Sequence, residues 1–183
     1  SMNAVKTTTL LQSSYNYRER GMNTLLLTPA RDDRYGSAKI TSRIGISADA
    51  FPFSGTDNLF AVTAEVCERS ALHCVMVDEA QFLTRDQVRE LGDICDRLDI
   101  PVLAFGIRTD FRTKAFPGSQ RLMEVAHSLQ EMKTICRCGN KAIFNARLGD
   151  KGIIREGEQV MIDSEAARYE ALCARCYLEA EEV

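Results

Sequence analysis

The stretch Cys-Val-Met-Val-Asp-Glu-Ala-Gln-Phe, residues 74–82, predicts a buried strand of a parallel sheet that ends in two carboxylates. Strands buried on both faces are continuous apolar runs, and in an open α/β sheet their carboxyl ends face the ligand crevice. Carboxylates at that edge, here Asp78 and Glu79, can hold Mg2+ through water and place a base beside a nucleotide. A core strand followed by a solvated acidic turn is the alternative, because apolar runs that end in acids are common.

Helical and strand patterns alternate on both sides of this stretch. The sequence predicts strands at residues 23–28, 74–77 and 100–105, and helices at 6–20, 57–70, 84–98 and 119–128. Thr84 and Gln87 have the spacing of a capping box. Residues 29–45 and 106–118 are polar and predict loops, the first ordered around a charged ligand. We therefore expect an α/β fold with a mostly parallel sheet covered by helices on both faces.

Composition limits the classes of protein that fit. The chain has 183 residues, 45% of them hydrophobic, and a net charge of −3, so no broad basic surface indicates nucleic-acid binding. No apolar run approaches the roughly 18 residues of a membrane span, and no secretory signal opens the chain. We expect a cytoplasmic protein without nucleic-acid or membrane partners. Near residue 131 the sequence changes to short predicted strands, cysteine pairs and charged turns. This change predicts domains at residues 1–131 and 132–183.

Two close cysteine pairs lie in the smaller domain, at Cys136 and Cys138 and at Cys173 and Cys176. Thiolates spaced this closely can bind one metal ion from a turn, and two such pairs complete a tetrahedral zinc site. Gly139 adds the backbone freedom that such a turn needs. Disulfides are the competing interpretation, which a cytosolic chain disfavours. With all four positions filled by protein, the Zn2+ is expected to be structural.

The first eight residues, Ser-Met-Asn-Ala-Val-Lys-Thr-Thr, end like a phosphate-binding loop. In that motif a lysine reaches the phosphates and a hydroxyl binds Mg2+, the positions that Lys6 and Thr7 fill here. Val5 replaces the glycine before the lysine, and a β-branched residue tolerates positive φ poorly. An ordinary helix start rich in lysine and threonine is the alternative.

Aromatic residues accompany the predicted loops and the second cysteine pair, namely Phe82, Phe111, Phe116 and Tyr169. Each is a candidate for stacking on a base, and ordinary core packing is the alternative for each.

Short blocks along nearly the whole chain resemble the zinc-containing, tetrameric class of thymidine kinases. Their order and spacing make coincidence very improbable. They are M-N-A-x-K-[ST]-T at residues 2–8, L-L-Q-S-S-Y-N-Y-x-E-R-G at 10–21, D-D-R-Y-G at 32–36, S-R-I-G at 42–45, V-D-E-x-Q-F-L at 77–83, D-I-P-V-L at 99–103, R-T-D-F-R at 108–112, K-T-I-C-x-C-G at 133–139 and E-G-E-Q-V at 156–160.

The resemblance implies a P-loop-type kinase domain and a zinc-binding domain with a lasso-like loop over the nucleoside. The reaction it implies is transfer of the ATP γ-phosphoryl group, with Mg2+, to the 5′-hydroxyl of thymidine, giving the monophosphate for nucleotide salvage and DNA synthesis. Glu79 matches the catalytic base and Asp78 the acid that holds Mg2+. Lys6 and Thr7 match the phosphate-binding lysine and the metal-binding hydroxyl.

The resemblance also implies a homotetramer and further binding residues. The remaining candidates for binding ATP and Mg2+ are Met2, Asn3, Ala4, Thr8, Arg34 and Gln81. Phe82, Phe116 and Tyr169 are candidates for contacting thymidine, and Met2 is a weaker one. Main-chain groups of the lasso-like loop are expected to read the thymine edge.

The chain departs from the family pattern at its start. Val5 stands where the family has glycine, and the first strand, with the front of the phosphate loop, is missing. Three explanations are open: a sequence that starts late, with Ser1 left by a tag, a degenerate paralogue, or another segment in place of the strand. We expect impaired ATP binding relative to an intact relative. A catalytically inactive nucleoside-binding protein is therefore the alternative function.

Overall fold

The computed structural model describes residues 5–30, 38–150, 152–159 and 168–181, which form two compact units. The sheet unit consists of residues 5–106 and 117–125, and the cysteine unit of residues 107–116 and the described residues from 126 onward. The predicted boundary near residue 131 stays a prediction.

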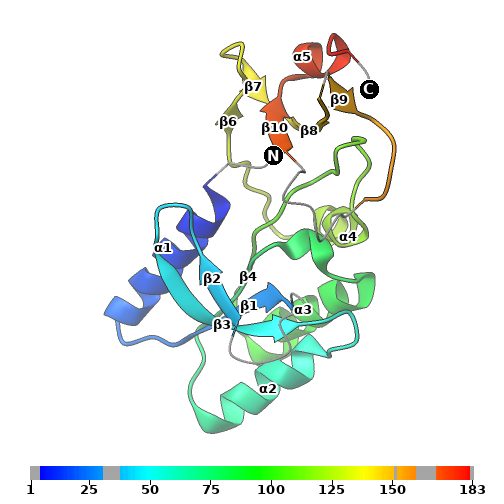
Figure 1. Cartoon of the computed structure of the whole chain (residues 1–183). Helices are drawn as coiled ribbons and strands as arrows, with labels where there is room; N and C mark the ends of the chain where they lie inside the picture. The colour runs from blue at the N-terminus through cyan, green and yellow to red at the C-terminus, as the bar shows by residue number, and fades with distance from the viewer. Residues whose placement is uncertain (1–4, 31–37, 151, 160–167, 182–183) are drawn as a thin grey trace. The chain divides into compact units, whose positions relative to one another are not determined.

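The sheet unit contains a five-stranded sheet with the order β2-β3-β1-β4-β5 (Figure 1). The β1–β3, β1–β4 and β4–β5 pairs are parallel, and only β2, at one edge, runs antiparallel to its neighbour. The strands are β1 (Thr24–Pro29), β2 (Ala38–Thr41), β3 (Ser47–Phe53), β4 (Cys74–Val77) and β5 (Val102–Ala104). The helices are α1 (Lys6–Glu19), α2 (Leu59–Arg69), η1 (Ala80–Phe82), α3 (Arg85–Leu98) and α4 (Pro117–Val125).

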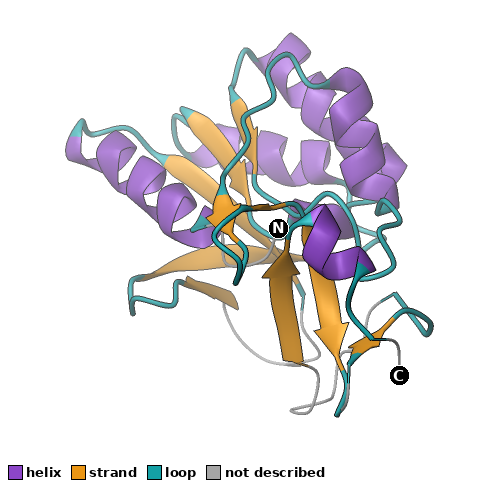
Figure 2. Ribbon diagram, turned by 90° about the horizontal axis from the view of Figure 1, so that it is seen from above, coloured by secondary structure: helices purple, strands orange, loops and turns teal. Residues whose placement is uncertain are grey.

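Helices cover both faces of this sheet, as the sequence predicts (Figure 2). Side chains alternate between the two faces of a strand. In β4, Cys74 and Met76 pack in the core that contains Leu10 and Leu11 of α1. Val75 and Val77 point into the other core, with residues of α2 and α3.

The predicted elements are confirmed in place, except for two missed strands and one shifted helix. The loop expected at residues 29–45 contains β2, and β3 follows it without having been predicted. Only Ile40 of β2 is fully buried, so the segment carries almost no periodic apolar signal and forms a strand by pairing with β3. The helix expected at residues 119–128 is α4, which begins and ends earlier.

The capping box of α3 is confirmed, and Gln87 makes two more hydrogen bonds outside it. Its buried side chain also donates to the backbone carbonyls of Ser54 and Asp57, at 2.7 and 3.0 Å. One residue therefore caps α3 and holds the turn between β3 and α2.

The cysteine unit is built on a short antiparallel sheet with the order β10-β8-β9 and on a β6–β7 hairpin. Its elements are β6 (Thr134–Ile135), β7 (Lys141–Ala142), β8 (Phe144–Leu148), β9 (Ile153–Ile154), β10 (Arg168–Leu172) and α5 (Ala174–Leu178). Its core is small and includes Cys136 and Cys173. Among the described residues of the chain, no helix is long and apolar enough to cross a membrane.

Gly118 is required by the packing of α4 on η1. A Cβ atom built on Gly118 lies 2.4 Å from the carbonyl oxygen of Leu83 and 3.1 Å from that of Ala80. We expect Gly118→Ala to lower the free energy of unfolding by about 1–3 kcal/mol, because the backbone must shift to admit the methyl group. Urea denaturation measures this change.

Gly92→Ala is the matched control for that substitution. Gly92 lies within α3, and a Cβ atom there meets nothing within 4 Å. Alanine at this position should stabilise the protein by about 0.5–1 kcal/mol, because it lowers the backbone entropy of the unfolded chain. Equal effects of the two substitutions contradict the packing argument.

Candidate functional site

The acidic pair lies at the carboxyl end of β4, between the ends of two parallel neighbours. The backbone amide of Asp78 donates to Leu27 of β1 at 2.8 Å. Ala80 donates to the carbonyl of Phe105, just beyond β5, at 2.9 Å. These bonds extend the sheet past β4 and place both carboxylates at the edge where open α/β sheets bind ligands.

Glu79 adopts a left-handed backbone conformation, with φ 47° and ψ 43°. This region costs a residue other than glycine about 1–2 kcal/mol, and such strain is concentrated at functional sites. The side-chain amide of Gln81 donates to the Glu79 carboxylate and holds its orientation. Gln81 is itself buried, whereas Phe82 is 40% exposed at the end of η1.

The first turn of α1 brings the Thr7 hydroxyl to the acidic pair. The Thr7 hydroxyl donates to the Asp78 carboxylate, with Oγ1 3.2 Å from Oδ2, across 71 positions of sequence. Hydroxyl and carboxylate oxygens are the hard ligands that Mg2+ prefers, so this pair fits that ion. Thr8 follows in the same turn and is half-buried.

Lys6, Asp78 and Glu79 share an electrostatic environment. Burial lowers the pKa of the Lys6 amino group, and the carboxylates of Glu79 and Asp78 oppose that shift. Burial, reinforced by the Glu79 charge, raises the pKa of Asp78, while Thr7 and Lys6 favour its ionised form. A cation bound between the two carboxylates would stabilise both charges.

The N-terminus of α1 is arranged for an anion. Helix N-termini present free N–H groups and a positive dipole end. The first turn of α1 contains no acidic residue, and its cap, Val5, makes no side-chain capping bond. The predicted site residues Met2, Asn3, Ala4 and Arg34 lie outside the described residues.

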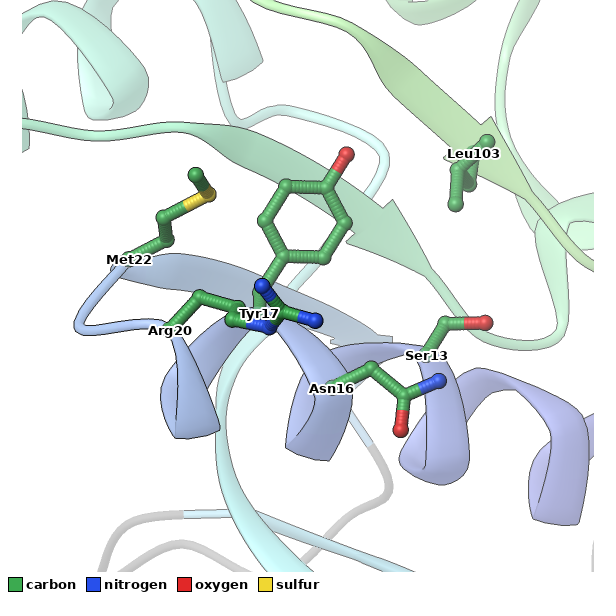
Figure 3. A pocket seen from close by; sticks show the side chains of 6 residues that line it. All are labelled: Ser13, Asn16, Tyr17, Arg20, Met22 and Leu103. Atoms are coloured by element: carbon green, nitrogen blue, oxygen red, sulfur yellow. The ribbon is translucent and has the colours of Figure 1, made fainter.

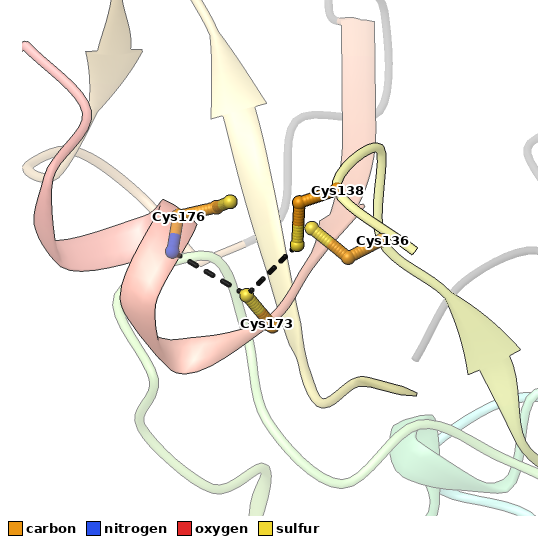
Figure 4. Close-up of side chains that lie close together, drawn as sticks. All are labelled: Cys136, Cys138, Cys173 and Cys176. Atoms are coloured by element: carbon orange, nitrogen blue, oxygen red, sulfur yellow. Dashed lines mark hydrogen bonds between the residues drawn. The ribbon is translucent and has the colours of Figure 1, made fainter. Parts of the chain in front are cut away.

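The four paired cysteines come together in the cysteine unit (Figure 4). Their sulfur atoms all lie within 4.8 Å of one another, and the Sγ atoms of Cys138 and Cys173 are 3.6 Å apart. A tetrahedral zinc ion with Zn–S bonds of about 2.3 Å separates its sulfurs by about 3.8 Å. None of the four is in a disulfide. The donor set and its spacing therefore fit zinc.

The turn between Cys136 and Cys138 prepares these thiols for a metal ion. Gly139 has φ 85°, and its amide donates to the Cys136 carbonyl at 2.9 Å. The backbone of Asn140 and the neighbouring thiols lower the pKa of Cys138 to about 6. The thiolate is the form that binds metal.

Phe116 and Tyr169 belong to the cysteine unit rather than the sheet unit. Phe116 is 5% exposed, and Phe111 is buried as well. Tyr169 is half-buried, and its hydroxyl accepts from Nε of Arg147 at 3.0 Å. Their contact with a nucleoside stays a prediction.

No role was predicted from the sequence for Arg147, Asp110 or Arg112, which form a connected network in the cysteine unit. The R-T-D-F-R block contains two of them. The third, Arg147, lies in the short strand β8 and is 3% exposed, and this burial is evident only from the structure.

A shallow apolar pocket lies elsewhere on the sheet unit, between α1 and β5 (Figure 3). It is lined by Ser13, Asn16, Tyr17, Arg20, Met22 and Leu103. None of the predicted site residues lines it, so we assign it no role.

Known proteins match this chain along nearly its whole length. The thymidine kinase family model matches residues 1–177. A thymidine kinase of Rhodopirellula baltica is 54% identical over 181 residues, which cover 98% of this chain and 85% of that protein. A thymidine kinase of Haemophilus influenzae is 54% identical over 180 residues, 98% of this chain and 93% of that protein. One from Legionella pneumophila is 54% identical over 183 residues, 99% of this chain and 87% of that protein.

Proposed function

The chain belongs to the thymidine kinase family, and we propose that it transfers the γ-phosphoryl group of ATP to the 5′-hydroxyl of thymidine. The observation that carries the proposal is the gathering of Lys6, Thr7, Asp78 and Glu79 at one edge of a parallel sheet. Phosphoryl transfer requires few covalent steps from a protein, so positioning and charge stabilisation supply most of the catalysis.

Glu79 is the proposed catalytic base. Its carboxylate accepts the proton of the 5′-hydroxyl and orients that oxygen for in-line attack on the γ-phosphorus. The hydrogen bond from Gln81 restricts the carboxylate to one orientation before substrate binds. Glu79, in its left-handed backbone conformation, directly precedes the η1 turn.

Lys6 and Thr7 are proposed to bind the phosphates of ATP and its Mg2+. The Lys6 ammonium neutralises phosphate oxygens, and the N–H groups of the α1 first turn add hydrogen bonds to them. Asp78 and the Thr7 hydroxyl would hold Mg2+. When bound, the ion neutralises charge on the phosphate oxygens.

The assignments of Met2, Asn3, Ala4, Thr8 and Arg34 to ATP binding rest on the family resemblance alone. So do those of Phe82, Phe116 and Tyr169 to thymidine binding. A structural Zn2+ held by the four cysteines is proposed to stabilise the cysteine unit. A homotetramer is likewise proposed from the resemblance, and light scattering of the purified protein measures it.

The direct test is phosphorylation of thymidine by the purified chain with ATP and Mg2+. Formation of thymidine monophosphate, dependent on both ATP and metal, supports the proposal. Thymidine binding by calorimetry without turnover would instead favour the alternative, an inactive nucleoside-binding protein.

Val5→Gly tests whether the altered phosphate loop limits activity. Val5 caps α1 with φ 46° and ψ 20°, a conformation that glycine adopts freely and a β-branched residue does not. Its side chain is 63% exposed, so little packing is lost on its removal. We expect a several-fold lower KM for ATP and an unchanged KM for thymidine, measured by initial rates.

Val5→Ala is the matched control, because alanine removes the β-branch but keeps most of the cost of the left-handed conformation. It should give a smaller improvement than glycine. If alanine equals glycine, the bulk of the valine side chain rather than its backbone strain limits ATP binding.

A further inference from the structure

Arg147 is a charged residue placed inside the cysteine unit, with 3% exposure. It lies in β8, and its neighbour on the same face of the strand, Asn145, donates to the carbonyl of Thr109 at 3.2 Å. This face of β8 therefore packs on the segment of residues 107–116. Burying a guanidinium is costly unless its N–H groups are bonded, so a retained buried arginine needs a reason.

The register of the sheet places Arg147 opposite Tyr169. The two residues are directly paired across β8 and β10, which puts both side chains on one face. Arg147 Nε donates to the tyrosine hydroxyl at 3.0 Å, and its guanidinium carbon lies 5.5 Å from the centre of that ring. Two contacts thus restrict the Tyr169 ring.

Phe111 also contacts the Arg147 guanidinium. The guanidinium carbon is 3.7 Å from the centre of the Phe111 ring, a close cation–π contact. The Phe111 carbonyl accepts from the hydroxyl of Tyr177 at 2.6 Å. A planar guanidinium can stack on aromatic faces and donate from its edge at once, which lysine cannot do.

The same network reaches the backbone of residues 157–159. Arg147 Nη2 donates to the Glu158 carbonyl at 3.2 Å, and Arg112 Nη1 donates to that of Gly157 at 2.9 Å. Gln159 donates to the Asp110 carboxylate at 3.2 Å, and that carboxylate also accepts two bonds from the Arg112 guanidinium. Arg147 therefore links the backbone carbonyl of Glu158 to the side-chain hydroxyl of Tyr169.

We propose that Arg147 is a positioning residue for the nucleoside, acting by holding the hydroxyl and ring of Tyr169 while its own guanidinium stacks on Phe111. The inference rests on the proposed function, in which Tyr169 contacts thymidine. Replacing a residue that only fills the core would affect folding, but it would not change KM for thymidine while leaving KM for ATP unchanged.

The test compares Arg147→Met and Arg147→Lys with the parent chain. Both should raise KM for thymidine about tenfold, the loss expected for one charge-assisted hydrogen bond, and leave KM for ATP unchanged. Tyr169→Phe should also raise KM for thymidine and add nothing further to Arg147→Met, because each removes the same bond. Equal rises in both KM values, or additive effects of the two substitutions, overturn the proposal.

Arg155→Met is the matched control in the same unit. Arg155 stacks on the ring of Tyr177, 4.6 Å from its centre, and donates to the Tyr177 carbonyl at 2.7 Å. Arg155→Met should lower the melting temperature but should not raise KM for thymidine relative to KM for ATP. If Arg155→Met raises KM for thymidine alone as much as Arg147→Met does, Arg147 has no specific role.

A spectroscopic measurement separates this inference from the proposed function. In protein labelled with 13C-tyrosine, the ring signal absent from Tyr169→Phe identifies Tyr169. Arg147→Met should shift and sharpen that signal, and an unchanged signal overturns the inference whether or not the parent chain phosphorylates thymidine. A parent chain that neither binds nor phosphorylates thymidine overturns the proposed function, and the nucleoside role of Arg147 with it.

Discussion

Replacing Glu79 by glutamine should lower kcat for thymidine phosphorylation by about 100- to 10,000-fold, the usual contribution of a positioned base. Glutamine has nearly the size of glutamate and can still contact Gln81, but it cannot accept the proton of the 5′-hydroxyl. The left-handed backbone at this position is unchanged by the substitution, so the fold should persist. Initial rates at saturating ATP and thymidine, with circular dichroism of the variant, measure the effect.

Glu65→Gln is the control for the change of carboxylate to amide. Glu65 is on α2, and its side chain is 62% exposed and paired with Arg69 four residues later. We expect wild-type turnover from this variant, because exposed pairs of this kind contribute little. If Glu79→Gln retains more than a tenth of wild-type kcat, another group takes the proton.

Removing the proposed zinc ion should unfold the cysteine unit. Structural zinc sites contribute roughly 10–16 kcal/mol of apparent binding free energy, more than a small domain has in reserve. The core of this unit contains only a few buried residues, and Cys136 and Cys173 are among them. We expect Cys176→Ser, or exhaustive chelation, to abolish stoichiometric zinc and the cooperative thermal transition of this unit.

Elemental analysis gives the zinc content and scanning calorimetry the transitions. Cys67→Ser is the control, since Cys67 is a half-buried free thiol of the sheet unit and not one of the clustered four. It should keep one zinc ion per chain. A Cys176→Ser protein with full zinc content and unaltered unfolding would refute the metal assignment.

Local sequence patterns were sufficient where a structure depends on neighbours along the chain. The apolar run of β4, the start of α1 at Lys6 and the capping box of Thr84 and Gln87 were all predicted from residues a few positions apart. The cysteine cluster followed from two short spacings. Family blocks supplied the function, because their order along the chain is itself sequence information.

Other features depended on which strands pair, and local patterns do not encode pairing. β2 and β3 were missed because their few buried residues become buried only when the two strands pair at the edge of the sheet. The bond between Thr7 and Asp78 spans 71 positions and exists because α1 and β4 meet at one end of the sheet.

The contact between Arg147 and Tyr169 shows the same limit most clearly. The family resemblance made Tyr169 a candidate for contacting thymidine, but nothing in the sequence indicated its partner. A shift of one residue in the β8–β10 register would turn one of the two side chains to the opposite face, so only the tertiary pairing brings arginine and phenol together.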